Sequence, residues 1–290
     1  MFRPWMRKAL GILTLIACPA AAWAEDPSPP FDKSGYALFN PTPTDQMRNF
    51  CTDRPTKGNA PCTVDAGHFQ IETDILNWTR SSIGGTTQDI FLYTNPTLKL
   101  GLNDRMDLEL NIAPLVQVKT RNNAAGTRSD QKGIGDLFAR VKYNLLGNEG
   151  GSLAVSLLPY VKVPTARAGI GNKSFESGLI VPVSFALPND FSLLLGPEID
   201  LFRNSTNSGY HANFQGLINL SRPITSSLTG SVELWSDINP DSATTTRQWS
   251  VDFALIWSVM PNLQLDIGTN IGFNRATPDV QTYVGISKRF

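Results

Sequence analysis

The residues best suited to catalysis or metal binding are two histidines and two neighbouring cysteines. His68 and His211 begin the tripeptides HFQ and HAN, and neither stretch sets a serine beside the histidine on one strand face. A general base must lie within hydrogen-bond reach of its nucleophile. The spacing of Cys51, Cys62 and the histidines also matches no zinc-ligand pattern. We therefore expect no catalytic site, no metal site and no bound cofactor.

The composition excludes further classes of protein. The 290 residues carry 25 Lys and Arg against 25 Asp and Glu, and the charged residues make up only 17%, against about 25% in an ordinary soluble domain. A nucleic-acid binder usually has a basic excess. A disordered chain combines high net charge with few apolar residues, whereas 41% of this chain is hydrophobic. A large ordered structure without a nucleic-acid partner is expected.

The first 24 residues have the form of a secretory signal peptide. A positively charged start precedes an apolar run over residues 9–17, and the tripeptide AWA at 22–24 is a small–x–small cleavage site. The apolar run is too short to span a bilayer. We expect residues 1–24 to be removed before Glu25, so that the mature protein is exported.

Export bears on the cysteines at positions 51 and 62. An oxidising compartment allows disulfides to form and persist. A close pair of cysteines in an exported chain is then more often a disulfide than a redox or metal site. The sequence predicts a disulfide between Cys51 and Cys62, closing a short loop.

Most of the chain beyond residue 66 alternates with a period of two. Between residues 106 and 119 nearly every second residue is apolar, and Asp107, Glu109 and Lys119 are among those between. This alternation predicts a strand with one apolar face. Similar stretches of about ten residues recur, the length that a tilted strand needs to cross a bilayer. Twelve strands are predicted, at 67–79, 88–102, 105–119, 134–146, 152–164, 175–187, 191–203, 210–222, 227–237, 247–259, 262–274 and 279–290.

The links between these strands alternate in length. Short turns alternate with longer polar links, among them residues 80–87, 120–133 and 165–174. A transmembrane barrel has short periplasmic turns and longer loops outside. An even number of strands leaves both termini on the periplasmic side.

A soluble β-sandwich is the alternative, because its apolar strand face packs inward while the polar face meets water. Three features favour a membrane barrel: the alternating links, aromatic residues near strand ends such as Phe91 and Trp257, and the final residue Phe290. Aromatic girdles mark membrane interfaces. A terminal aromatic residue resembles the signal that outer-membrane proteins present to their assembly machinery.

The predicted fold class is therefore all-β. A transmembrane antiparallel β-barrel of about 12 strands spans 67–290, and residues 25–66 form a periplasmic extension or a plug. The expected location is the bacterial outer membrane. The expected partners are its lipid bilayer, the assembly machinery and a small-molecule solute that the sequence does not identify.

Charged residues on the polar strand faces are candidates for lining the interior. Eight strands leave an interior filled by side chains and sixteen leave a water channel, so twelve predict a narrow or plugged pore. The charges either form a ladder for a solute or a packed polar core without a transport role. The candidates are Glu72, Lys99, Asp107, Glu109, Lys119, Asp136, Arg140, Lys142, Lys162, Glu198, Asp200 and Arg289.

The segment before the first strand carries a more specific pattern. It contains Thr52-Asp53-Arg54-Pro55 and the run PCTVDAGHFQIE over residues 61–72. This segment resembles the outer-membrane transporter family labelled "MetA-pathway of phenol degradation". The tetrapeptide either pins the segment to the barrel wall through charge-assisted hydrogen bonds or forms a surface turn.

The resemblance implies an outer-membrane channel or transporter for small molecules, including hydrophobic or aromatic compounds. The family usually has Ser and Tyr where this chain has Cys51 and Cys62, and two such departures fit one acquired disulfide. Two other functions stay open: a structural or sealed barrel without transport and, third, an outer-membrane lipid hydrolase.

Overall fold

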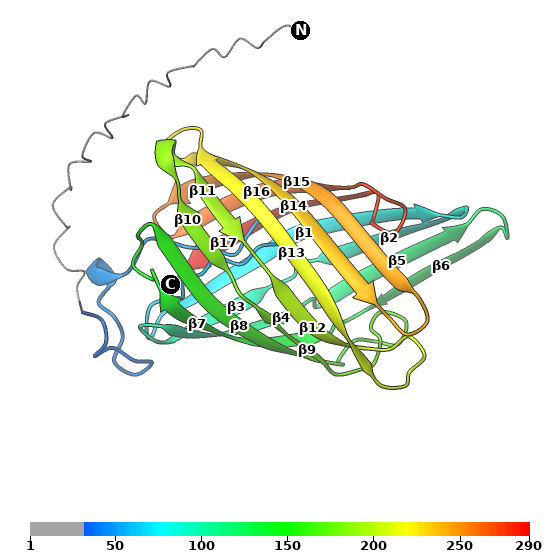
Figure 1. The fold of residues 1–290 in the computed structure, drawn as a ribbon, viewed down its shortest axis with the longest axis horizontal. Coiled ribbons are helices and arrows are strands. Elements are labelled where there is room, and N and C mark those ends of the chain that lie inside the picture. Colours follow the sequence, from blue (N-terminus) through cyan, green and yellow to red (C-terminus); the bar gives the residue numbers. More distant parts are fainter. Residues whose placement is uncertain (1–31) are drawn as a thin grey trace, which may run out of the picture. The chain divides into compact units, whose positions relative to one another are not determined.

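A computed structural model describes residues 32–290, whose strands form one antiparallel sheet that closes into a barrel (Figure 1). The sheet closes where β1 (Phe69–Ile83) pairs with β17 (Val280–Arg289), from Gln70 opposite Arg289 to Arg80 opposite Val280. Within the described range, no helix is long and apolar enough to cross a membrane. The predicted signal peptide, residues 1–24, lies outside the described residues.

Seventeen strand segments make up the barrel wall, and five of its passes are each broken into two segments, so the chain makes twelve passes. The predicted fold class is confirmed. Four of the five breaks contain a proline, which has no N–H to donate to a neighbouring strand. The broken passes are β2 (Thr86–Tyr93) with β3 (Thr97–Asn103), β4 (Met106–Ile112) with β5 (Leu115–Asn122), β6 (Thr127–Gly133) with β7 (Leu137–Leu146), β9 (Glu176–Ile180) with β10 (Val183–Ala186), and β11 (Ser192–Leu195) with β12 (Glu198–Arg203). The unbroken passes are β1, β8 (Leu153–Val163), β13 (Tyr210–Pro223), β14 (Leu228–Pro240), β15 (Thr245–Met260), β16 (Leu263–Gly272) and β17.

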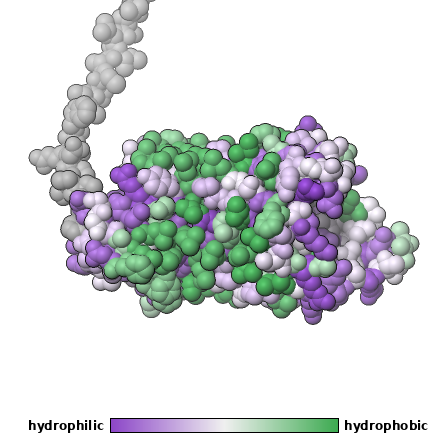
Figure 2. Space-filling view, turned by 90° about the horizontal axis from the view of Figure 1, so that it is seen from below, coloured by the Kyte–Doolittle hydropathy of each residue, from purple (hydrophilic) through white to green (hydrophobic). Residues whose placement is uncertain are grey.

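The barrel has its apolar side chains outside and its polar side chains inside. Ile218, Leu234 and Ile267 are more than half exposed, whereas Asp107 and Lys142 are fully buried. Figure 2 shows apolar residues gathered along the middle of the visible wall and hydrophilic residues toward its ends. This arrangement is the reverse of a soluble sandwich, and it suits a wall that faces lipid.

Two predicted long links are largely strand. The predicted link 80–87 is the end of a hairpin, because β1 continues to Ile83 and β2 starts at Thr86 around Gly84 and Gly85, which both have positive φ. The predicted link 120–133 is likewise paired from Val116 opposite Gly133 to Asn122 opposite Thr127. The sequence predicts loops in both places because these strand ends carry polar residues on both faces. Short and long links therefore alternate less clearly along the chain than the sequence predicts.

The prediction that Lys119 faces the interior is wrong. The break at Pro114 changes which residues of the pass point outward, because Lys119 lies opposite Asp89, and Asp89 lies opposite Arg80. Arg80 points away from the lumen, since Asn77, an odd number of residues earlier, receives a hydrogen bond from the interior side chain of Gln281. Inward and outward side chains therefore do not alternate regularly through residues 105–119, because the strand is interrupted at Pro114.

Candidate functional site

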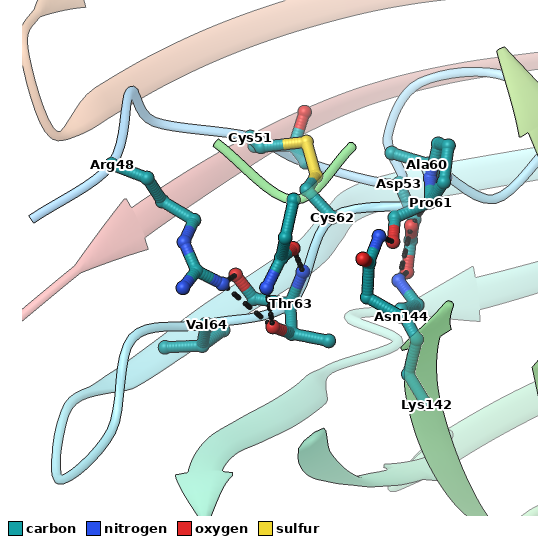
Figure 3. Close-up of a disulfide and its surroundings, with 12 residues drawn as sticks. Arg48, Cys51, Asp53, Ala60, Pro61, Cys62, Thr63, Val64, Lys142 and Asn144 are labelled. Carbon is teal, nitrogen blue, oxygen red and sulfur yellow. Dashed lines mark hydrogen bonds and ion pairs between the residues drawn. A yellow bond between two sulfur atoms is a disulfide. The ribbon is translucent and has the colours of Figure 1, made fainter. Parts of the chain in front are cut away.

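A short loop of the N-terminal segment lies inside the barrel. Cys51 and Cys62 form a disulfide at its base, as predicted (Figure 3). We call residues 51–62 the disulfide loop. The barrel wall holds both sides of this base: Gln70 Nε2 donates to the carbonyl of Cys51 at 2.8 Å, and Asn144 Nδ2 donates to the carbonyl of Pro61 at 2.9 Å.

Arg54 binds the wall between the first strand and the last strands of the barrel. Its Nη2 and Nε atoms lie 2.7 and 3.2 Å from the two carboxylate oxygens of Asp266, and its Nη1 lies 2.6 Å from Asp74 Oδ1. A forked guanidinium–carboxylate pair is among the strongest hydrogen-bonded contacts. Its guanidinium also lies so close to Gly285 that a Cβ at that position would overlap it. A side chain at position 285 would therefore have to displace the docked guanidinium of Arg54.

Asp53 binds two lysine side chains on a different part of the wall. Its carboxylate accepts hydrogen bonds from Lys142 Nζ at 2.8 Å and from Lys99 Nζ. Burial alone raises the pKa of Asp53, but the two ammonium groups outweigh it and hold the pKa below its usual value. The backbone N–H groups of Asp53 and Arg54 both donate to Glu72 Oε2, at 2.9 and 3.0 Å.

Lys57 completes the attachment on a third side. Its Nζ donates to Ser250 Oγ at 2.9 Å and to the carboxylate of Asp252, and its backbone N–H donates to Glu233 Oε1 at 3.1 Å. The ammonium also lies 4.8 Å from the centre of the Trp235 ring. Burial lowers the pKa of Lys57 from its usual value. The disulfide loop is thus fastened by contacts to β1, β3, β7, β14, β15 and β16.

A second ionic cluster lies where the N-terminal segment meets the short turns. The fully buried carboxylate of Asp65 is 3.1 Å from Lys33 Nζ, 3.3 Å from Arg48 Nε and 3.5 Å from Arg289 Nη1. Glu149 binds Lys33 at 2.7 Å and Arg48 at 2.9 Å. The N-terminal segment is therefore bound to the barrel in two places. Its disulfide loop is bound inside the lumen, and Lys33, Arg48 and Asp65 are bound near the short turns.

An internal cavity of about 260 Å³ adjoins the disulfide loop. Arg140 and Glu198 line it from the wall, and the nearest carboxylate oxygen to the guanidinium of Arg140, on Glu109, is 4.0 Å away. Ile180, which also lines the cavity, belongs to a cluster with Leu158, Tyr160 and Phe138. The cavity lining is therefore largely polar and charged, with Arg140 as a weakly paired cation, and Ile180 connects it to the neighbouring apolar cluster.

The remaining predicted interior charges face the interior, and several form pairs across neighbouring strands. Glu109 and Asp107 lie opposite Arg140 and Lys142 on the next strand, and Lys142 Nζ is 3.1 Å from Glu109. Lys162 lies 3.4 Å from Asp136 and 2.7 Å from Glu176. The interior residues from the sequence are Glu72, Lys99, Asp107, Glu109, Asp136, Arg140, Lys142, Lys162, Glu198, Asp200 and Arg289.

The sequence did not single out Lys57 as part of the site. Three positions separate it from Arg54 in the disulfide loop, and no alternating strand pattern covers that segment. The available signal was its place between the two cysteines, which restricts every residue of the loop to one region of the lumen.

The two histidines have structural contacts. His68 Nε2 lies 2.7 Å from the carbonyl of Thr42, and its Nδ1 lies 3.1 Å from the carbonyl of Phe290. The ring nitrogens of His211 each lie 2.7 Å from an amide oxygen, of Asn204 and Asn239. Among residues 32–290, no group of three or more His, Cys, Asp or Glu is arranged to hold a metal ion.

Loss of the disulfide should loosen the loop. A Cys51→Ser/Cys62→Ser variant is expected to lose about 2–4 kcal/mol of stability, because the open chain regains the entropy that the closed loop restricts. The urea midpoint in detergent measures this loss, and wild type treated with a reductant should shift equally. An unchanged midpoint in both samples would contradict the expectation.

Comparison with known families decides where the chain belongs. Residues 52–290 match the model of the family described as "Putative MetA-pathway of phenol degradation". The chain belongs to this family. The match starts at Thr52 within the disulfide loop and continues through the barrel, so it contains Asp53, Arg54 and Lys57. The resemblance predicted from the sequence is confirmed.

Solved structures show how widely the fold of this family member is shared. An outer membrane channel from Pseudomonas putida F1 is similar at a TM-score of 0.62, with 12% identity over 81% of this chain and 100% of that one. The NanC porin reaches 0.46 with 11% identity (76% and 98% covered), and the CymD monoaromatic hydrocarbon channel 0.44 with 10% (77% and 88%). At 12% identity the first similarity shows a shared fold alone. The other two similarities have TM-scores below 0.5, and no conclusion is drawn from them. No curated protein matches the chain.

Proposed function

We propose that the protein is an outer-membrane channel for small molecules, and that residues 25–66 act as its plug. The carrying observation is the interior: a closed barrel whose charged inner wall binds the disulfide loop at Asp53, Arg54 and Lys57, next to a cavity of about 260 Å³. A loop bound in this way narrows the path through the barrel. Displacement of the loop would widen the path.

We infer that the solutes include hydrophobic or aromatic compounds. Family membership supports this class. The apolar cluster beside the polar cavity also supports it, because Ile180 belongs to both and the Arg140 guanidinium lies 5.7 Å from the centre of the Phe138 ring in that cluster. A neutral phenol would contact this apolar cluster, and an aromatic acid would also contact the guanidinium of Arg140.

Reconstitution tests the proposal directly. Purified protein in planar bilayers should give discrete conductance steps, and protein-loaded liposomes should take up uncharged phenols and aromatic acids faster than empty liposomes. Bilayers with stable inserted protein but no conductance, together with uptake equal to that of empty liposomes, would reject a channel. Such a result would support the sealed barrel, which the dense ion pairing of the loop favours.

The lipid hydrolase is a weaker candidate. Both histidines bind carbonyl or amide oxygens, and a general base must reach its nucleophile. Phospholipid hydrolysis by the purified protein, absent in a His68→Ala/His211→Ala variant, would restore this function.

Export and assembly complete the proposal. The signal peptide at residues 1–24 directs export to the periplasm and is then removed, and the assembly machinery inserts the chain with both termini on the periplasmic side. The last residue is well placed for a role in this step, because the Phe290 ring stacks on Phe69 with centroids 4.6 Å apart, at the junction of the first and last strands.

Deletion of Phe290 should therefore reduce membrane assembly more than synthesis. The physical reason is the loss of both the terminal aromatic group and its stack on Phe69. Comparing heat-modifiable barrel with total protein in cell fractions measures the difference. A Phe290→Tyr variant retains the ring and serves as the control. Equal barrel fractions for the deletion and wild type would count against the expectation.

A further inference from the structure

The hairpins formed by β1, β2, β5 and β6 carry an ordered pattern on the face that points away from the lumen. Figure 1 shows these strands reaching the end of the barrel opposite the N-terminal segment. The cross-strand partners place the side chains in rows. Listed from the wall outward, the rows are Leu76, Tyr93 and Leu115; then Trp78, Phe91, Gln117 and Lys132; then Arg80, Asp89, Lys119 and Asp130; and then Ser82, Thr87, Arg121 and Arg128.

The composition of these rows changes along the strands as expected for a surface that passes from lipid into water. Apolar side chains come first, and the aromatic rings of Trp78 and Phe91 follow in a row that also holds Lys132. The rows with several charged residues begin two residues further along the strands. Aromatic rings mark the lipid–water interface of a barrel. Two residues of strand add about 7 Å, so the charged rows lie at the level of lipid headgroups.

The outermost row places two like charges directly opposite each other. Arg121 and Arg128 are cross-strand partners, and like charges in that arrangement are destabilising. Among the described residues, neither forms a salt bridge, although Arg121 interacts electrostatically with Asp89. Lys119 lies opposite Asp89 and Asp130 on the neighbouring strands, and its Nζ lies 5.1 Å from the centre of the Phe91 ring.

The acids on this face are already engaged. Asp89 accepts hydrogen bonds from Arg80 Nε at 2.8 Å and Nη2 at 3.0 Å, and from Trp78 Nε1 at 2.9 Å. Asp130 accepts both of its contacts from Gln117 Nε2, at 2.8 Å. Lys119, Arg121 and Arg128 therefore remain available to an external anion.

A groove of about 500 Å³ joins these groups, lined by the two charged rows. We infer that Lys119, Arg121 and Arg128 bind the phosphate groups of a phosphorylated glycolipid, such as the lipid A of the outer leaflet. Two adjacent guanidinium groups match phosphate oxygens in pairs, and the ligand removes the repulsion between them. The inference rests on the proposed location, with this end of the barrel outside.

Native mass spectrometry of the full-length protein in detergent tests the site with bisphosphorylated lipid A as the probe. An Arg121→Glu/Arg128→Glu variant should bind it at least about tenfold more weakly, because two charge-assisted contacts become repulsive. An Arg121→Gln/Arg128→Gln variant, which lacks the repulsion, should fall between. Arg105→Glu reverses the charge of another exposed arginine, in the turn between β3 and β4, and should bind like wild type.

Two further arms identify the source of the phosphate. Lipid A without phosphates should bind weakly to wild type, and inorganic phosphate at the same concentration should not compete. Equal binding of the dephosphorylated lipid, full competition by inorganic phosphate, or unchanged binding by both Arg variants would each overturn the inference. Conductance of the same samples reports on the channel separately, so a silent barrel that binds lipid A would reject only the proposed transport.

Discussion

Replacing Arg54 with alanine should raise the single-channel conductance of the protein in planar bilayers. The guanidinium holds the disulfide loop against Asp74 and Asp266, whose side chains are 5% and 0% exposed. Its removal leaves two buried carboxylates without their partner, a change that costs about 3–5 kcal/mol when a buried pair is broken. The loop should then leave the wall for part of the time, and the open path should widen.

Two further variants make this measurement specific. Arg222→Ala removes an arginine that lies 5.0 Å from the Phe191 ring, outside the lumen, and it should conduct like wild type. Arg54→Lys retains one charge but not the fork, so its conductance should lie between. An Arg54→Ala protein that inserts normally and has the same conductance as wild type would show that the loop does not limit the path.

Introducing arginine at Val141 should prevent stable insertion, whereas removing the neighbouring Arg140 should not. Val141 lies opposite Leu108 on the outward face, while Arg140 lies opposite Glu109 in the interior. A charge on the lipid face near the midplane costs about 2–4 kcal/mol. Arg140→Ala removes only a loosely paired cation, with 4.0 Å to Glu109.

Fractionation of outer membranes measures insertion of the two variants, and conductance then reports on Arg140→Ala. Its ion preference should shift toward cations, because the acids that line the cavity lose a counter-charge. Cysteines introduced at 141 and 140 provide the control for the faces, since only position 141 should react with a lipid-phase probe. The opposite labelling would reverse the face assignment, because a shift of one residue exchanges the faces of a strand.

The alternation of side chains was enough to predict the number of passes and most of the interior. Asp107, Glu109 and Lys142 follow from it because their strands are regular over the relevant residues. Lys119 does not, since the break at Pro114 lies between it and Glu109. A proline in the sequence shows that a ladder can be interrupted, but not by how many residues the faces then shift.

The long hairpins and the contacts of the disulfide loop could not be predicted from the sequence, for different physical reasons. Residues 120–133 are polar on both faces, and strand patterns are visible only where one face is apolar. The contacts of Lys57 with Asp252 and Glu233 join a segment without periodicity to two distant strands. Only the folded ring brings these groups together. The disulfide was accessible because it depends on compartment and closeness along the chain alone.

Closure of the sheet through β1 and β17 has a kinetic consequence. The first strand finds its second neighbour only when the last residues of the chain have arrived, since Gln70 lies opposite Arg289. Pairings between such distant parts of a chain form slowly, because the entropy of closing the intervening chain comes before the gain. Until then β1 presents an unpaired edge, and unpaired edges are templates for association. The disulfide loop directly precedes β1, so the segment that later occupies the lumen is tethered to the strand that completes the ring.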